Sequence, residues 1–143
     1  EIKSTLSRMQ NQKKIDASLQ IITCVNEDSE KAIIRAKKTL AFYVSVGKIY
    51  REFLAINGFE NETRNIYEEY EKNGLQNNHE LVSESMVNEL CIAGTSNECR
   101  NQLKQFYETG IDLPIIQFNP TDNVENSFDL VTSTFSESCD WKK

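Results

Sequence analysis

The sequence predicts a helix-rich α/β fold in which two parallel strands are joined by a long helical crossover. The first strand is the apolar run of residues 19–25, LQIITCV, and the second is the run of residues 111–118, IDLPIIQF. Between them lie several segments whose apolar side chains recur at helical spacing. Parallel strands need such a crossover, because only antiparallel strands can be joined by a tight turn.

Helical periodicity follows the first strand in segments that glycines separate. The first helix begins near Asp28, whose charge complements the dipole of a helix N-terminus. Its predicted buried stripe consists of Ile33, Ala36, Leu40, Tyr43 and Val44. Further helices are predicted over residues 48–57, 60–73 and 80–90. Glycines break or close these segments: Gly47, Gly58 and Gly74.

The clearest helix signal lies at residues 95–109. Thr95 can act as the N-cap, and Glu98 three residues later completes a capping box. Gly110 lies where the helix needs a left-handed residue to end. The second strand follows directly, and its nearly continuous apolar run predicts burial on both faces. Pro114 has no N–H for the strand ladder, so it belongs among the first residues of this strand.

Two terminal helices complete a single domain over residues 1–143, with about six helices and two strands in all. The first spans residues 1–14, with Ile2, Leu6 and Met9 on one face. The last begins at Asp122, and its inward residues are Val124, Phe128, Val131 and Phe135. Two parallel strands do not make a stable sheet by themselves. We therefore expect the chain to be a piece of a larger sheet.

Two stretches of the chain resemble the luciferase-like monooxygenase superfamily. One is Ala93-Gly94-Thr95 followed by the capped helix, Gly110, Ile111-Asp112 and the apolar strand. The other is the first strand with NEDSEKA at residues 26–32 and LAFY at residues 40–43. The resemblance covers residues 16–118 and is greatest for the deazaflavin-dependent branch, that of the methylenetetrahydromethanopterin reductases.

The resemblance implies that the chain is the C-terminal third of a TIM (β/α)8 barrel, which in this family has more than about three hundred residues. The two strands would be its seventh and eighth. The parent would be a coenzyme F-420 (deazaflavin)-dependent oxidoreductase that moves hydride to or from a one-carbon pterin or a similar small substrate. An FMN-dependent monooxygenase is the alternative. Because the family holds its cofactor mainly on earlier strands, this piece would line the substrate side, be inactive alone and need not bind a cofactor.

In TIM barrels the reactive face lies at the carboxyl ends of the strands. Four polar residues there are candidates for lining the cofactor or substrate: Thr23, Asn26, Gln117 and Asn119. Alternatively, Asn26 caps a helix and Asn119 shapes the turn before Pro120. Gln117 is the most informative, because a buried amide must find hydrogen-bond partners. No catalytic residue is assigned, since the single histidine, His79, lies in a polar link and has no nucleophile beside it.

Composition argues against several classes of protein. The net charge of −6 and the lack of a basic stripe argue against nucleic-acid binding. No apolar run approaches the length of a membrane span. The cysteines, at positions 24, 91, 99 and 139, lack metal-binding spacing, so they predict reduced thiols in a cytoplasmic protein. The aromatic set Phe42, Tyr43, Tyr50 and Phe53 could line a planar cofactor, but helical spacing favours packing.

A second hypothesis is a self-contained helical interaction module. Two unclosed parallel strands would leave ladder groups and apolar faces exposed. The predicted partner is then a second copy of the chain or a complementary barrel half. The strand count separates the two hypotheses, because an autonomous module must contain a further strand and the sequence pattern indicates none.

Overall fold

The computed structural model describes residues 16–136, so the helix predicted over residues 1–14 lies outside the described residues. The strands are β1 (Ser18–Val25), β2 (Cys91–Gly94) and β3 (Leu113–Phe118). The helices are α2 (Ser29–Val46), α3 (Lys48–Leu54), α4 (Glu60–Asn73), α5 (Glu84–Leu90), α6 (Ser96–Glu108) and α7 (Val124–Phe135), with a π-helical turn η1 (Ala55–Phe59) and a 3-10 turn η2 (Asn78–Leu81). Over residues 16–136, no helix has both the length and the hydropathy to cross a membrane.

The strand β2 corrects the prediction of two strands. It is only four residues long, too short to give a periodic signal, and all four are buried. It pairs in parallel with β1, from Ile22 opposite Cys91 to Val25 opposite Gly94. The side chain of Gln102 in α6 makes two hydrogen bonds to the outer edge of β2. Ala93 N–H donates to Gln102 Oε1 at 2.8 Å, and Gln102 Nε2 donates to the Ala93 carbonyl at 3.0 Å. The chain therefore supplies its own third strand, which is the feature that the interaction-module hypothesis requires.

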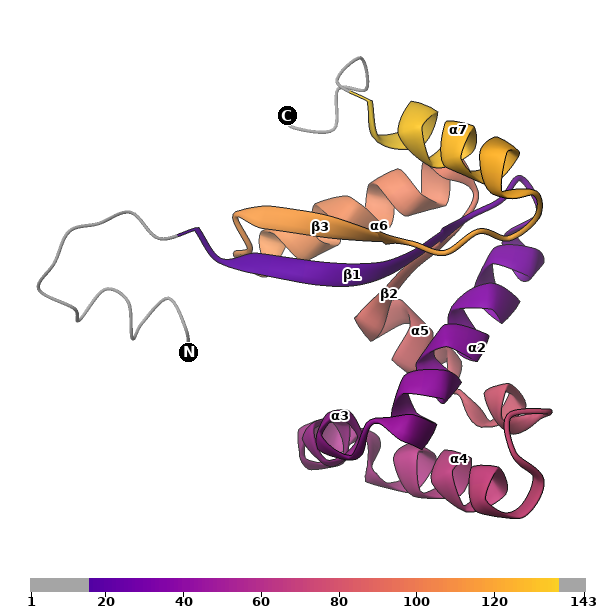
Figure 1. The fold of residues 1–143 in the computed structure, drawn as a ribbon. Coiled ribbons are helices and arrows are strands. Elements are labelled where there is room, and N and C mark those ends of the chain that lie inside the picture. Colours follow the sequence, from indigo (N-terminus) through magenta and orange to yellow (C-terminus); the bar gives the residue numbers. More distant parts are fainter. Residues whose placement is uncertain (1–15, 137–143) are drawn as a thin grey trace, which may run out of the picture.

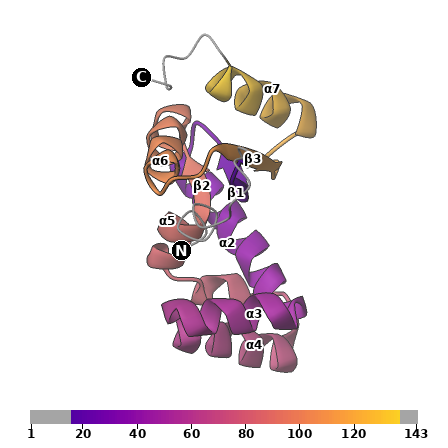
Figure 2. The same cartoon turned by 90° about the vertical axis from the view of Figure 1, so that its left-hand side faces the viewer.

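The three strands form one parallel sheet in the order β2-β1-β3. The crossover from β1 to β2 runs through α2 to α5, and the crossover from β2 to β3 runs through α6 (Figures 1 and 2). Right-handed crossovers that move in opposite directions along a sheet lie on opposite faces. We call the two faces the α2 face and the α6 face. In a closed barrel consecutive strands are neighbours, whereas here β1 separates β2 from β3.

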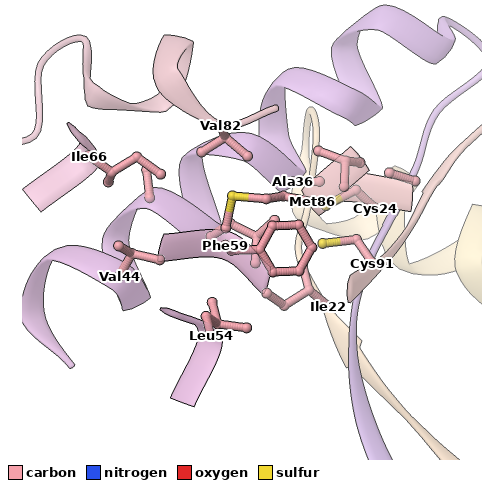
Figure 3. Packing of buried hydrophobic residues seen from close by; sticks show 14 of the residues in the cluster. Ile22, Cys24, Ala36, Val44, Leu54, Phe59, Ile66, Val82, Met86 and Cys91 are labelled. Atoms are coloured by element: carbon pink, nitrogen blue, oxygen red, sulfur yellow. The ribbon is translucent and has the colours of Figure 1, made fainter. Parts of the chain in front are cut away.

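The larger core lies on the α2 face, between the sheet and helices α2 to α5 (Figure 3). Ile22 and Cys24 of β1 point to this side because alternate residues of a strand face opposite ways. They meet the fully buried stripe of α2, which consists of Ala32, Ala36, Leu40 and Val44. The predicted start of this helix is confirmed, with Asp28 as its N-cap. The helix predicted over residues 80–90 is instead broken before Ser83, whose hydroxyl caps α5 by accepting from Met86 N–H.

The smaller core lies on the α6 face. Ile21 and Val25 of β1 pack there with residues of β2, α6 and α7: Ile92, Cys99, Leu103 and Val131. The predicted capping box of α6 is confirmed, with bonds running both ways between Thr95 and Glu98. These bonds hold the pKa of the Glu98 carboxyl below its ordinary value. Gly110 follows the helix with a φ of 96°, in the left-handed region that was predicted.

Two predictions of burial near the C-terminal end are wrong. Strand β3 lies at the edge of the sheet, and Leu113 and Ile115 on its α2 face are 53% and 45% exposed, because no helix covers them there. Pro114 is its second residue, as predicted. Val124 and Phe128 of α7 are also exposed, although the Phe128 ring meets Phe118 edge-on at 5.8 Å.

Candidate functional site

The helices that follow β1 and β3 leave part of the sheet open. Helix α2 leaves β1 over the α2 face, whereas α7 leaves β3 over the opposite face (Figure 1). The α2 face of β3 is therefore without a helix of its own. In open parallel sheets, ligands bind where neighbouring strands send their helices to opposite sides, beyond the carboxyl ends of the strands.

Two clefts lie at this open part of the α2 face. The larger cleft has a volume of about 540 Å³ and is lined by Arg35, Lys38, Thr39, Phe42, Tyr43, Leu75, Gln76, Asn78, Gln117 and Asn119. The smaller cleft has a volume of about 280 Å³ and is lined by Gln20, Ile22, Tyr43, Tyr50, Leu90 and Gln117. The larger volume is in the range of small-molecule sites.

Gln117 and Tyr43 stand between the two clefts and line both. Gln117 Nε2 donates to the Tyr43 hydroxyl at 3.1 Å, and Gln20 Nε2 donates to Gln117 Oε1 at 3.4 Å. The half-buried amide thus has a partner at each end and is held at the carboxyl half of β3. It is the predicted site residue with the most direct access to both clefts.

Asn119 lines the larger cleft and also shapes the turn after β3. Its Nδ2 donates to the Gln117 carbonyl at 2.8 Å, which stabilises the local bend. Its Oδ1 accepts from the Thr39 hydroxyl at 3.1 Å and so ties the turn to α2. The role of Asn119 in the turn is therefore observed, and the same side chain also lines the larger cleft.

Thr23 and Asn26 line neither cleft. Thr23 is fully buried on the α6 face, and its hydroxyl donates to the Ile21 carbonyl at 2.9 Å. Asn26 joins the loops that follow β1 and β3: its Nδ2 donates to Thr121 Oγ1 at 2.8 Å and to Asp122 Oδ2 at 2.7 Å. It is not the helix cap, because Asp28 takes that position.

Helix α2 supplies half of the larger cleft through a second stripe of side chains, which we call the cleft stripe. It consists of Arg35, Lys38, Thr39, Phe42 and Tyr43. The spacing i, i+3, i+4, i+7, i+8 places all five on one side of the helix. Arg35 and Lys38 were not among the predicted site residues, and Tyr43 was predicted to lie in the core, whereas it is 36% exposed. The signal that could have found the stripe is this same spacing in polar and aromatic residues.

Arg35 is held in place in the wall of the larger cleft. Its Nε donates to the Pro120 carbonyl at 3.0 Å, and its Nη1 donates to Thr39 Oγ1 at 2.9 Å. Among the described residues no carboxylate lines this cleft, although Arg35 and Lys38 both do. The cleft therefore carries positive charge in a chain whose net charge is −6.

The cysteines of residues 16–136 are packing residues rather than nucleophiles. Cys24, Cys91 and Cys99 are free and buried. Burial raises the pKa of Cys24 and of Cys99 to about 12 and raises that of Cys91 as well. Since the thiolate is the reactive form, none of the three is poised for chemistry near neutral pH. Residues 16–136 contain no cluster of three or more His, Cys, Asp or Glu side chains that could hold a metal ion.

The sequence matches the model of a known protein family. A family model described as luciferase-like monooxygenase matches residues 3–113, which is most of the chain. The matched range contains β1, β2 and the whole cleft stripe of α2, and it ends at the first residue of β3. No curated protein matches the sequence.

Proposed function

Because the chain belongs to the luciferase-like monooxygenase family, we propose that it is the C-terminal portion of an oxidoreductase that uses coenzyme F-420. FMN is the alternative cofactor. The observation that supports this proposal is the position of Gln117 and Asn119 at the carboxyl end of β3, because TIM barrels bind their ligands at that end of the strands. The free thiols of Cys24, Cys91 and Cys99 favour a cytoplasmic parent.

The residues of the two clefts fit one wall of a cofactor and substrate site. The rings of Tyr43 and Tyr50 and the Gln117 amide can contact the edge of a planar ring. The chain has five glycines, and none belongs to a run that could cradle a phosphate group. When bound, a deazaflavin supplies hydride transfer, while the protein orients it and its substrate. We therefore assign the substrate side to this chain and expect no turnover from the chain alone.

In the parent, β1, β2 and β3 would be the last three strands of a TIM barrel. Consecutive strands are neighbours in such a barrel, so β3 would leave β1 and pair with β2. For that exchange, Gln102 would have to release the outer edge of β2, where it makes two hydrogen bonds with Ala93. The proposal thus requires a rearrangement when the missing strands join, in which Gln117 and Asn119 stay at the carboxyl end of β3 while the clefts between β3 and α2 are rebuilt.

Co-expression with the N-terminal part of a deazaflavin-dependent luciferase-like reductase tests the proposal. We expect a stable one-to-one complex that quenches F-420 fluorescence and transfers hydride, whereas neither part does so alone. FMN serves as the matched cofactor in a parallel titration. A complex that binds FMN and not F-420 would establish the alternative. Failure of the parts to associate, with the chain monomeric and folded, would sink the proposal.

A second candidate function is self-association through an apolar stripe on α3 and the following turn η1, which we call the α3 stripe. Ile49, Phe53 and Ile56 follow one another at helical spacing and are 82%, 58% and 82% exposed. Such a stripe costs free energy in water unless another surface covers it. We propose that the occupant is a second copy of this chain, because one apolar stripe can pack against its own copy about a two-fold axis.

Sedimentation at two protein concentrations tests this second candidate. We expect a dimer that Phe53→Glu converts to a monomer. Val124→Glu is the matched control, because Val124 is equally exposed but lies on α7, across the sheet. A wild-type monomer at both concentrations, or dissociation by both substitutions alike, would rule out the α3 stripe as the interface.

A further inference from the structure

The larger cleft combines features that point to the chemistry of its ligand. It has cations at one part of its wall, Arg35 and Lys38, and aromatic rings at another, Phe42 and Tyr43. All four come from one side of α2, so their relative positions are fixed by a single helix of eighteen residues. A site built in this way can recognise the charge and the shape of a ligand independently.

Arg35 is oriented by the fold and keeps hydrogen-bonding capacity for a ligand. The guanidinium has five N–H donors. Two of them are used, by the Pro120 carbonyl and the Thr39 hydroxyl. The ion pairs of residues 16–136 do not include Arg35 or Lys38. The charge of Arg35 is therefore uncompensated while its side chain is half-buried, which is the condition in which binding an anion gains most.

Thr39 and Asn119 hold the position of Arg35. The Thr39 hydroxyl accepts from Arg35 and donates to Asn119 Oδ1 at 3.1 Å, and both Thr39 and Asn119 are buried. The guanidinium is thus connected through α2 to the turn that follows β3. Because these contacts restrict the rotamers of Arg35 before a ligand arrives, less conformational entropy is lost on binding.

The aromatic part of the wall offers apolar contact beside the cations. The rings of Phe42 and Tyr43 meet edge-on, with centroids 5.7 Å apart. Phe42 is exposed, and Leu75 adds a further exposed apolar side chain to the same wall. Exposed rings with a fixed edge-on arrangement suit the body of a flat, apolar molecule.

We propose that the larger cleft binds a small organic anion, with a carboxylate or phosphate at Arg35 and Lys38 and a planar apolar body against Phe42 and Tyr43. The inference goes beyond the proposed function, because the cleft exists where β3 lies beside β1. The binding itself belongs to the chain as it stands and needs neither the cofactor nor the missing strands.

The test uses three probes of one shape: 2-naphthoate, 2-naphthyl phosphate and the neutral 2-naphthamide. Isothermal titration or ligand-observed NMR with the full chain gives their dissociation constants. We expect at least one of the two anions to bind about tenfold more tightly than the amide, as one charge-assisted interaction provides. Whichever anion binds more tightly identifies the acidic group. Equal dissociation constants for all three probes would overturn the proposal.

Substitutions of neighbouring cations provide the matched control. Lys38→Gln and Lys37→Gln change the net charge equally and lie side by side in α2, but only Lys38 lines the cleft. We expect Lys38→Gln and Arg35→Gln to weaken anion binding several-fold and to leave 2-naphthamide binding unchanged. Equal weakening by Lys37→Gln would mean a general effect of charge and would refute the site.

Arg35→Lys keeps the experiment decisive if Arg35→Gln disturbs the fold. Lysine retains the charge but not the planar fork, so we expect anion affinity between those of the wild type and Arg35→Gln. Thermal unfolding of each variant identifies any that has lost structure. Selective anion binding together with failure of the co-expression experiment would keep this site and remove the oxidoreductase proposal, and the reverse pair of results would do the opposite.

Discussion

Helix α2 carries two stripes of side chains with opposite roles. Ala32, Ala36, Leu40 and Val44 are fully buried against the sheet and helices α4 and α5. The cleft stripe lies on an adjacent side of the same helix and lines the larger cleft. Both stripes have the same helical spacing, so periodicity alone cannot tell them apart. The two stripes differ in what covers them. The sheet and two helices cover the first stripe, whereas the second stripe faces the side of β3 from which α7 turns away.

The largest effect on stability is expected from a substitution that leaves a cavity in the buried stripe. Leu40 has no exposed surface, and we expect Leu40→Ala to lower the free energy of unfolding by about 2–5 kcal/mol, the range for a buried leucine. Urea denaturation followed by circular dichroism measures it. Lys38→Ala, two residues away in the cleft stripe, should change the same quantity by less than about 0.5 kcal/mol. Similar losses for both variants would contradict the division into two stripes.

An intermediate effect is expected at Thr39, where the two stripes meet. Thr39 belongs to the cleft stripe but is buried, and its hydroxyl contacts Arg35 and Asn119. Thr39→Val keeps the shape and removes the hydroxyl, leaving the buried Asn119 Oδ1 without this partner. We expect a loss of about 1–3 kcal/mol of unfolding free energy. Thr39→Ser retains the hydroxyl and removes the methyl group, so it should lose less. A loss for Thr39→Ser with none for Thr39→Val would show that the methyl group, not the hydrogen bonds, stabilises this contact.

The fold could be predicted where a local signal sets the structure. The Thr95–Glu98 capping box and the left-handed Gly110 are confirmed because each depends on contacts within one turn of a helix. Strand β2 could not be predicted, since four buried residues carry no period and their pairing with β1 depends on a partner about seventy residues away. The exposure of Leu113 and Ile115 was missed for the same reason, because it follows from the strand order.

The candidate site was predictable in part. Gln117 and Asn119 could be singled out because polar residues at the end of an apolar strand need partners. Arg35 and Lys38 could not, because which side of α2 stays uncovered depends on where α7 leaves β3. Tyr43 was assigned to the core because an aromatic residue at core spacing usually lies there. Its partial exposure comes from the same open part of the α2 face.

The smallest effect is expected from Tyr43→Phe, which removes the hydroxyl that accepts from Gln117 Nε2 at 3.1 Å. Water can reach this bond because both side chains line the clefts, so the loss should be no more than about 0.5 kcal/mol of unfolding free energy. Urea denaturation measures it, and Tyr50→Phe serves as the control for removing a tyrosine hydroxyl in the smaller cleft. A loss above about 1.5 kcal/mol for Tyr43→Phe would mean that the bond is shielded from water. The clefts beside Tyr43 would then be closed to water in solution, and Tyr43 would belong to the core as its spacing predicts.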